Sequence, residues 1–190
     1  LVRLHFDVSS KIKIVYVGAL TNTKNQIALL RVLNSANIEA EIIFLGDGIN
    51  KQSLIDFSKR VSSSIKICFK GCVSRDETIE HMLEADIFIS LSKGEGLPIA
   101  VLEAMYSGCF MVLSAIPSHK EVSPPSERCF FVDLSINDEI LDSLNYIRDN
   151  IEEIKRGRDK SKKYAVNNFG LQNMLDGYKK VYDSLYEINA

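Results

Sequence analysis

The chain has 190 residues, of which 46% are hydrophobic and 25% are charged, and its formal net charge is −2. This length allows one domain with a buried core and is too short for two ordinary domains. The composition is that of a globular protein, and the near-neutral charge excludes the global basic field that a nucleic-acid-binding protein uses.

Strand-like and helix-like segments alternate along most of the chain, after an extended lead-in over residues 1–10. The predicted strands are short and almost wholly apolar: Ile12–Val17, Glu41–Leu45, Ile65–Phe69, Asp86–Ser90, Phe110–Leu113 and Cys129–Val132. The predicted helices between them show apolar residues at helical spacing or capping signals: Lys24–Ala36, Lys51–Val61, 74–84 and Pro98–Ser107. From Asn137 onward the pattern is helical, in three pieces broken near Gly157 and at residues 167–170, and the last piece covers about residues 171–188.

This alternation predicts the fold class. Strands and helices joined by connections of a few residues require parallel strands with right-handed crossovers. Short apolar strands suit a sheet that is covered on both faces. We therefore predict an α/β fold, a Rossmann-like doubly wound parallel sheet of about six strands. Such sheets bind ligands beyond the carboxyl ends of their strands, where the topology switches.

Neither the cysteines nor the histidines show the spacing of a metal site. The cysteines are Cys68, Cys72, Cys109 and Cys129. Each lies within or directly after an apolar run, so we interpret them as buried free thiols in a reducing compartment. His119 is predicted to lie in a loop, residues 117–121, near the ligand-binding edge of the sheet.

No apolar run approaches the ~18 residues that a membrane-spanning helix needs. No signal peptide is visible, so we expect a cytoplasmic protein. A basic run over residues 155–163 is interpreted as a solvated helix face. The alternative is peripheral contact of this run with an anionic membrane surface, or with an acidic acceptor.

The most informative stretch runs from Ser92 to Met105 and contains two acids. Glu95 lies in a glycine-rich loop after a strand, and Glu103 lies in the helix that follows. Helical side chains lean toward the N-terminus, so Glu103 can face the loop. The helix N-terminus between the acids suits a phosphate, so the order of groups matches a sugar, a diphosphate and a ribose. The alternative is that Glu95 is a loop acid and that Glu103 caps a neighbouring element.

A second loop, Gly18–Asn25, follows the first predicted strand. Gly18 permits a close approach of the backbone, and Lys24 can pair with a diphosphate. The alternative is a tight turn with a solvated lysine. Gly46-Asp47-Gly48 is not a dinucleotide fingerprint, because Lys51 occupies the position of the third glycine.

The segment EGLPIAVLEAM, which carries Glu95-x7-Glu103, resembles the signature of glycosyltransferase family 4, whose members are retaining enzymes of the GT-B fold. IVYVGALTNTKN, IIFLGDG, the block from FKGCVS to HKEV and the tail NFGLQNMLDGYKKVYDSLYEI resemble the same family. The resemblance thus covers nearly the whole chain.

The resemblance implies a domain arrangement that spacing does not show. Members of the family have two Rossmann-like domains, of which the C-terminal one binds the nucleotide-sugar donor and the N-terminal one binds the acceptor. Residues 1–190 match only the donor-binding domain, so we expect residues 1–10 to end the interdomain connection and the acceptor domain to be absent. The implied partners are a UDP-, GDP- or ADP-linked sugar, the missing domain and a glycan or lipid-linked acceptor, with no metal or other cofactor.

The resemblance also assigns roles to individual residues. Glu95 contacts hydroxyls of the donor sugar and, with Lys24 on the diphosphate, forms the catalytic pair. The remaining implied donor-binding residues hold the diphosphate, the ribose or the base: Gly18, Gly71, Val73, Gly96, Leu97, Pro98, Ile99 and Glu103. One position departs from the family, which commonly carries arginine where this chain has Ala19. Either Lys93 or another cation replaces that arginine, or donor binding is weaker, or catalysis has been lost.

The function that we predict is retaining transfer of a sugar from a nucleoside diphosphate to a glycan or lipid-linked acceptor, in surface polysaccharide biosynthesis. The isolated domain is expected to bind donor without turnover, because half of the cleft is missing. The alternatives are a GT-B-type nucleotide-sugar 2-epimerase and a non-catalytic nucleotide-sugar-binding domain, which Ala19 supports best.

Overall fold

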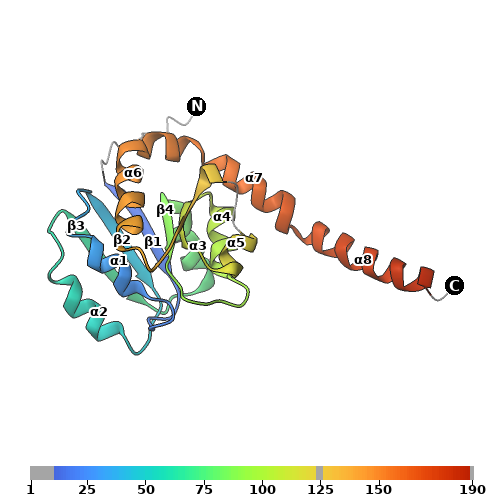
Figure 1. The fold of residues 1–190 in the computed structure, drawn as a ribbon, viewed down its shortest axis with the longest axis horizontal. Helices are drawn as coiled ribbons and strands as arrows, with labels where there is room; N and C mark the ends of the chain where they lie inside the picture. Colours follow the sequence, from blue (N-terminus) through green and yellow to red (C-terminus); the bar gives the residue numbers. More distant parts are fainter. Residues whose placement is uncertain (1–10, 123–125, 189–190) are drawn as a thin grey trace.

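The computed structural model describes residues 11–122 and 126–188 of the chain (Figure 1). Six strands form one sheet in the order β3-β2-β1-β4-β5-β6. Their bounds are Ile12–Val17 (β1), Ala40–Leu45 (β2), Ile65–Gly71 (β3), Ile87–Ser90 (β4), Phe110–Ser114 (β5) and Cys129–Val132 (β6). Every neighbouring pair of strands is parallel, so the predicted doubly wound α/β sheet is confirmed.

Helices follow the strands and cover both faces of the sheet (Figure 1). Their bounds are Gln26–Val32 (α1), Lys51–Ser58 (α2), Arg75–Glu84 (α3), Ile99–Ser107 (α4), Pro117–Val122 (α5), Asn137–Arg156 (α6), Arg158–Phe169 (α7) and Leu171–Ile188 (α8). A single 3₁₀ turn, Ser126–Arg128, precedes β6. The three helical pieces predicted after residue 137 are confirmed, and the last of them extends away from the sheet.

The core consists of two apolar clusters, one on each face of the sheet. Alternate residues of a strand point to opposite faces. Ile14 and Tyr16 therefore pack with residues of α1, α2 and α6, whereas Val15 packs with residues of α3, α4 and α7. Because both faces are covered, the strands need no polar side, which explains their nearly continuous apolar sequences.

Two helix ends match the sequence signals. Ser74 caps α3, because its hydroxyl accepts a hydrogen bond from the Glu77 amide at 3.1 Å. Gly108 ends α4 in the left-handed conformation, with φ 83°, which glycine adopts without strain.

Several predicted helix boundaries were wrong by a few residues: the helices predicted to end at Ala36 and Val61 end at Val32 and Ser58. The helix predicted from Lys24 begins at Gln26, because Asn25 is left-handed with φ 57° and its side-chain amide donates to the Leu91 carbonyl at 3.2 Å. Residues 117–121, predicted as a loop, belong to the short helix α5, whose polar sequence has no helical period of apolar residues.

The cysteines differ in burial. All four are free thiols, and Cys109 and Cys129 are buried, which raises the pKa of each thiol to about 12. Cys72 is exposed and Cys68 is half-buried, so the prediction of four buried thiols was wrong for these two. No helix in the described part of the chain combines the length and the apolar character that crossing a membrane requires.

Candidate functional site

The order in which the chain adds strands reverses between β1 and β4, which are parallel neighbours in the sheet. The helix after β1 packs on one face of the sheet, and the helix after β4 packs on the other. The two loops that leave the carboxyl ends of these strands therefore separate and form the crevice in which doubly wound proteins bind ligands. These loops are residues 18–25 and 91–98, the same two segments that the sequence singles out.

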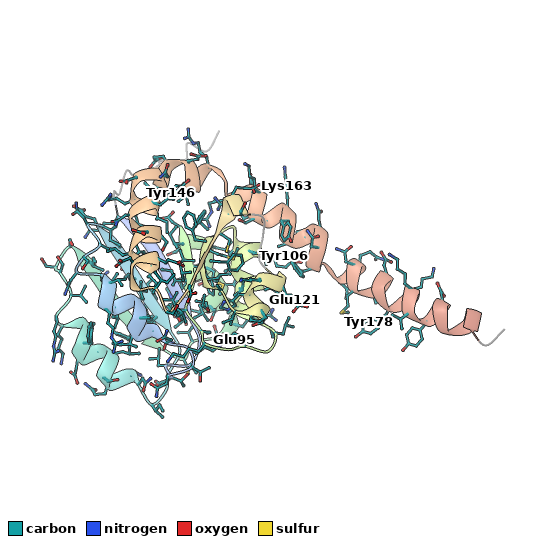
Figure 2. All side chains as sticks on the ribbon, viewed as in Figure 1. Glu95, Tyr106, Glu121, Tyr146, Lys163 and Tyr178 are labelled. Carbon is teal, nitrogen blue, oxygen red and sulfur yellow. The ribbon has the colours of Figure 1, made fainter. Side chains whose placement is uncertain are left out.

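Lys24 and Glu95 meet in this crevice. The Lys24 Nζ lies 2.5 and 2.7 Å from the two carboxylate oxygens of Glu95, and the Ser92 hydroxyl donates to one of these oxygens at 2.6 Å. The Glu95 side chain is only 12% exposed and that of Lys24 is 27% exposed. Figure 2 shows Glu95 at the edge of the sheet, below the strand ends. The structure thus brings together the two residues predicted to be catalytic.

The charge of Glu95 is stabilised in place. Burial alone raises the pKa of its carboxyl, but the hydrogen bonds from Lys24 and Ser92 and the positive charge of Lys24 outweigh this effect. The pKa of Glu95 therefore lies below its usual value of 4.5. A carboxylate that stays ionised can accept hydrogen bonds from sugar hydroxyls.

The backbones of the two loops are also tied together. The buried Tyr16 hydroxyl donates to the Lys24 carbonyl and accepts from the Leu91 amide at 2.8 Å. Burial raises the pKa of this hydroxyl, so it stays protonated and can donate. The Lys93 amide donates to the Thr23 carbonyl at 2.8 Å. Lys24 and Glu95 are therefore held on a common backbone scaffold.

A buried polar cluster supports the Glu95 loop from beneath. His119 is 0% exposed, and its Nδ1 lies 3.0 Å from the Ser114 carbonyl, which can only accept, so Nδ1 carries the proton. Its Nε2 then faces the Ser90 hydroxyl at 3.5 Å. The Ser114 hydroxyl donates to the Ser92 carbonyl at 2.5 Å, and Ser92 in turn bonds Glu95. Burial lowers the pKa of His119 below 6.5, so the ring is neutral at pH 7.

Glu103, the second acid of the motif, pairs with an arginine that sequence reasoning missed. The Arg75 Nε donates to a Glu103 carboxylate oxygen at 3.0 Å. Glu103 is 17% exposed and Arg75 is 79% exposed. Arg75 is the first residue of α3, which Ser74 caps, so Glu103 contacts this helix through a side chain and does not cap it.

Two of the predicted donor-binding residues, Gly18 and Val73, line one cavity. It has a volume of about 290 Å³, lies at the ends of β1, β2 and β3, and is also lined by Ala19 and Thr78. Its apolar lining residues pack with the core cluster on the α3–α4 face of the sheet. Gly71 is buried at the end of β3 instead, where its carbonyl accepts from the Gly46 amide at 2.7 Å.

At the start of α4, some of the predicted diphosphate-binding residues are exposed, and most of their backbone amides are not free to donate. Leu97 and Ile99 are 66% and 56% exposed, while Pro98 is buried, and nothing lies within 4 Å of where a side chain on Gly96 would begin. The Ile99 amide already donates to the Leu97 carbonyl at 3.0 Å. Since proline has no amide hydrogen, only the Leu97 amide of the stretch 97–99 is without a partner in the described residues. Diphosphate binding by this backbone stays a prediction.

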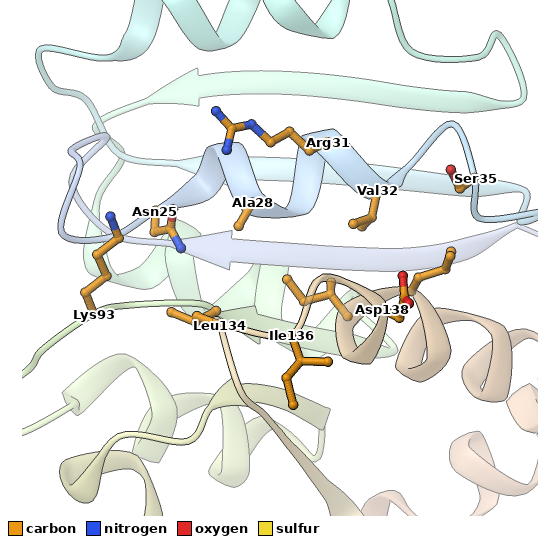
Figure 3. Close-up of a pocket in the computed structure, with 11 residues that line it drawn as sticks. Asn25, Ala28, Arg31, Val32, Ser35, Lys93, Leu134, Ile136 and Asp138 are labelled. Carbon is orange, nitrogen blue, oxygen red and sulfur yellow. The ribbon is translucent and has the colours of Figure 1, made fainter.

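A larger cavity, of about 520 Å³, lies between α1 and the start of α6 (Figure 3). Arg31, Lys93 and Asp138 supply charge there, and the apolar lining residues belong to the core cluster of the other face of the sheet. Lys93, the first candidate to replace the missing arginine, thus lines this cavity. No group of three or more acidic, histidine or cysteine side chains suited to a metal ion occurs within residues 11–122 and 126–188.

Comparison with known proteins places the chain in a family. The family model of glycosyl transferases group 1 matches residues 5–165. The sulfoquinovosyl transferase SQD2 of Arabidopsis thaliana is 27% identical over 126 residues, which are 66% of this chain and 24% of that protein. The O-antigen biosynthesis glycosyltransferase WclY of Escherichia coli is 24% identical over 176 residues, which are 90% of this chain and 47% of that protein.

The structure of HepE from Anabaena in complex with UDP has the same fold, with a TM-score of 0.77 and 16% identity over 92% of this chain and 49% of that one. The chain thus spans about half or less of the length of these proteins. Because the family model matches most of the chain, the chain belongs to the group 1 glycosyltransferases.

Proposed function

We propose that this chain is the donor-binding domain of a glycosyltransferase that moves a sugar from a nucleoside diphosphate to a hydroxyl of a glycan or lipid-linked acceptor. The observation that carries the proposal is the meeting of Lys24 and Glu95 at the topological switch. Family membership supports it, and so do the names of relatives that assemble O-antigen and transfer sulfoquinovose. The reaction belongs, on this proposal, to surface polysaccharide or glycolipid synthesis on the cytoplasmic side.

The ion pair gives each group a partner that it can exchange. When a nucleotide sugar enters, its diphosphate takes the ammonium group of Lys24, and a sugar hydroxyl takes the carboxylate of Glu95. Each group then keeps a hydrogen-bonding partner, which offsets part of the cost of breaking the ion pair. The ammonium group of Lys24 is then placed to stabilise the negative charge that develops on the leaving diphosphate.

The acceptor site lies, on this proposal, in a second domain, since the chain spans only 47% of WclY. The isolated chain is then expected to bind the donor and to transfer nothing, because proximity of acceptor and donor supplies much of the rate of a group transfer.

Thermal unfolding of the 190-residue chain with UDP, GDP and ADP tests the proposal. A ligand at about 100 times its dissociation constant stabilises the folded state by about 2.7 kcal/mol, which is readily measured. One of the three is expected to raise the melting temperature of the wild type and to lose most of its effect on Lys24→Ala. Lys179→Ala, in the middle of the exposed helix α8, is the matched control and is expected to respond like the wild type. A folded wild type that responds to none of the three contradicts the proposal.

A further inference from the structure

Arg75 is an exposed cation that one hydrogen bond holds in place. Its Nε donates to the Glu103 carboxylate at 3.0 Å, and its side chain is 79% exposed. Within the described residues its other N–H groups have no polar partner. Because a guanidinium carries five N–H donors in a fixed plane, the donors on its two terminal nitrogens remain free to bind an anion.

Arg75 lies in the chain between two residues that line the 290 Å³ cavity, although it is not itself a lining residue. Val73, two positions before it, and Thr78, one helical turn after it, both line this cavity, together with Gly18 and Ala19. Residues three apart on a helix lie on the same side, so Arg75 and Thr78 share one side of α3. The start of α3 thus forms one wall of the cavity, which Ala19 lines from the β1 loop, and the Arg75 side chain extends from this wall to Glu103 on α4.

Other cations of the region are directed elsewhere or are already paired. Lys24 is engaged by both oxygens of Glu95 until, on the proposed function, it exchanges this partner for the diphosphate, and Lys51 pairs with Asp47 at 2.5 Å. Lys93 lines the larger cavity, on the other face of the sheet. Ala19 has no polar side chain to offer, although it lines the same cavity as Gly18. A diphosphate that enters from the side of the 290 Å³ cavity thus meets the free N–H donors of Arg75.

We propose that Arg75 is a donor-binding residue that contacts the diphosphate, and that Glu103 positions its guanidinium for this contact. The assignment rests on the proposed function and names a residue that neither the two-acid motif nor its spacing contains. A guanidinium held along one edge presents its other edge for two parallel hydrogen bonds to phosphate. Because Glu103 already restricts the side chain, less conformational entropy is lost on binding.

The assignment changes what Glu103 does. A carboxylate has about four acceptor positions, and Arg75 uses one of them, so Glu103 can still accept a hydrogen bond from a ribose hydroxyl. Glu103 then acts on the donor twice, once directly and once through Arg75. Removing Arg75 affects the phosphates alone, whereas removing Glu103 affects both parts of the ligand.

Titration of the full chain with UDP and with uridine, followed by NMR, tests the assignment. Arg75→Ala is expected to weaken UDP binding by about tenfold or more, which corresponds to about 1.4 kcal/mol. The same substitution is expected to change uridine binding by less than about twofold, because uridine carries no phosphate. Arg75→Lys keeps the charge and loses the planar fork, so its UDP affinity is expected to lie between those of the wild type and Arg75→Ala.

Two further variants sharpen the result. Arg60→Ala removes an exposed arginine two positions after the last residue of α2 and is expected to bind UDP like the wild type. Ala19→Arg in the Arg75→Ala background places a guanidinium on the opposite wall of the same cavity and is expected to restore UDP affinity. Since Arg75 is exposed but pairs with the largely buried Glu103, its loss is expected to lower the melting temperature by only a few degrees, and a cooperative thermal transition shows that the variant is folded.

The outcomes separate the two proposals. If Arg75→Ala binds UDP as tightly as the wild type does, the assignment of Arg75 is overturned, and the proposed donor-binding function is unaffected. If Arg75→Ala weakens UDP binding and uridine binding equally, the assignment is overturned as well. Arg75 would then act on the ribose through Glu103 and not on the phosphates. A folded wild type that binds neither UDP, GDP nor ADP overturns the proposed function, and the role of Arg75 falls with it.

Discussion

Lys24 and Glu95, 71 positions apart in the chain, form an ion pair in which the lysine Nζ lies 2.5 and 2.7 Å from the two carboxylate oxygens. Lys24 comes from the loop after β1 and Glu95 from the loop after β4. These strands are neighbours in the sheet only because the chain first builds β2 and β3 outward on one side and then returns. The order of the strands therefore creates the pair, and the crevice in which it lies, together.

The pair is expected to couple energetically. Lys24→Ala leaves the Glu95 carboxylate, which is 12% exposed, without its cation and is expected to lower the free energy of unfolding by about 1–2 kcal/mol. The double variant Lys24→Ala with Glu95→Ala is expected to lose about 1 kcal/mol less than the sum of the single variants. Urea unfolding at pH 7 measures all four free energies.

A matched pair supplies the control. Lys59 and Asp56 are also in contact, at 2.7 Å, but their side chains are 67% and 53% exposed, so their coupling is expected to be close to zero. Because the folded-state pKa of Glu95 is lowered, its contribution to stability is present above pH 4.5 and is lost as the pH falls through the folded-state value. Strictly additive free energies for Lys24 and Glu95 would show that the ion pair does not stabilise the fold.

His119 is expected to make the fold sensitive to mild acid. Burial lowers its pKa below 6.5, an effect that Glu95 opposes and Lys24 reinforces. Below pH 6.5 the unfolded chain binds a proton at this ring that the folded chain does not, so the free energy of unfolding falls as the pH falls. The loss from this one group approaches about 1.4 kcal/mol per pH unit.

His119→Gln removes this titration. Its free energy of unfolding is expected to be lower than that of the wild type at pH 7.5, because the variant loses packing and hydrogen bonds around Ser114. Between pH 7.5 and 5.5 it is then expected to fall less steeply than that of the wild type. Urea unfolding at several pH values gives both slopes, and parallel curves would mean that the ring of His119 is not held neutral by the fold.

The strands were predictable because each one carries its own signal. A strand buried on both faces must be apolar along its length, so Ile12–Val17 and Cys129–Val132 could be placed to the residue. Asn25 shows the limit of this reasoning. This left-handed residue precedes α1, and its side chain bonds to Leu91, 66 positions later in the chain, a contact that no local pattern reveals.

The candidate site was predictable only where its residues belong to a local sequence pattern. The spacing of Glu95 and Glu103 and the loop with Lys24 carry a recognisable local pattern, but Arg75 lies 28 positions before Glu103 and was legible only as part of a capping box. His119 was placed in a loop because its six-residue helix is too short to show a period. Contacts between loops depend on the packing of the whole sheet, which no single segment contains.

The absence of a side chain at Gly46 is expected to allow the close approach of its backbone to that of Gly18. Its φ is 136°, and a Cβ at this position would lie 2.1 Å from the Gly18 carbonyl oxygen. Gly46→Ala is therefore expected to lower the free energy of unfolding by more than about 2 kcal/mol, or to displace the β1 loop that carries Lys24. In a chain of this size, each kcal/mol corresponds to about 2–4 °C in melting temperature.

Gly94→Ala is the matched control for Gly46→Ala, because no atom lies within 4 Å of the added carbon at position 94. Its free energy of unfolding is expected to stay within about 0.5 kcal/mol of the wild type. Differential scanning calorimetry of both variants, followed by UDP titration of whichever remains folded, separates stability from binding. If Gly46→Ala melts with the wild type and binds UDP equally well, the β1 loop tolerates a side chain beneath Gly18. The close approach of these two backbones is then not what sets the position of Lys24.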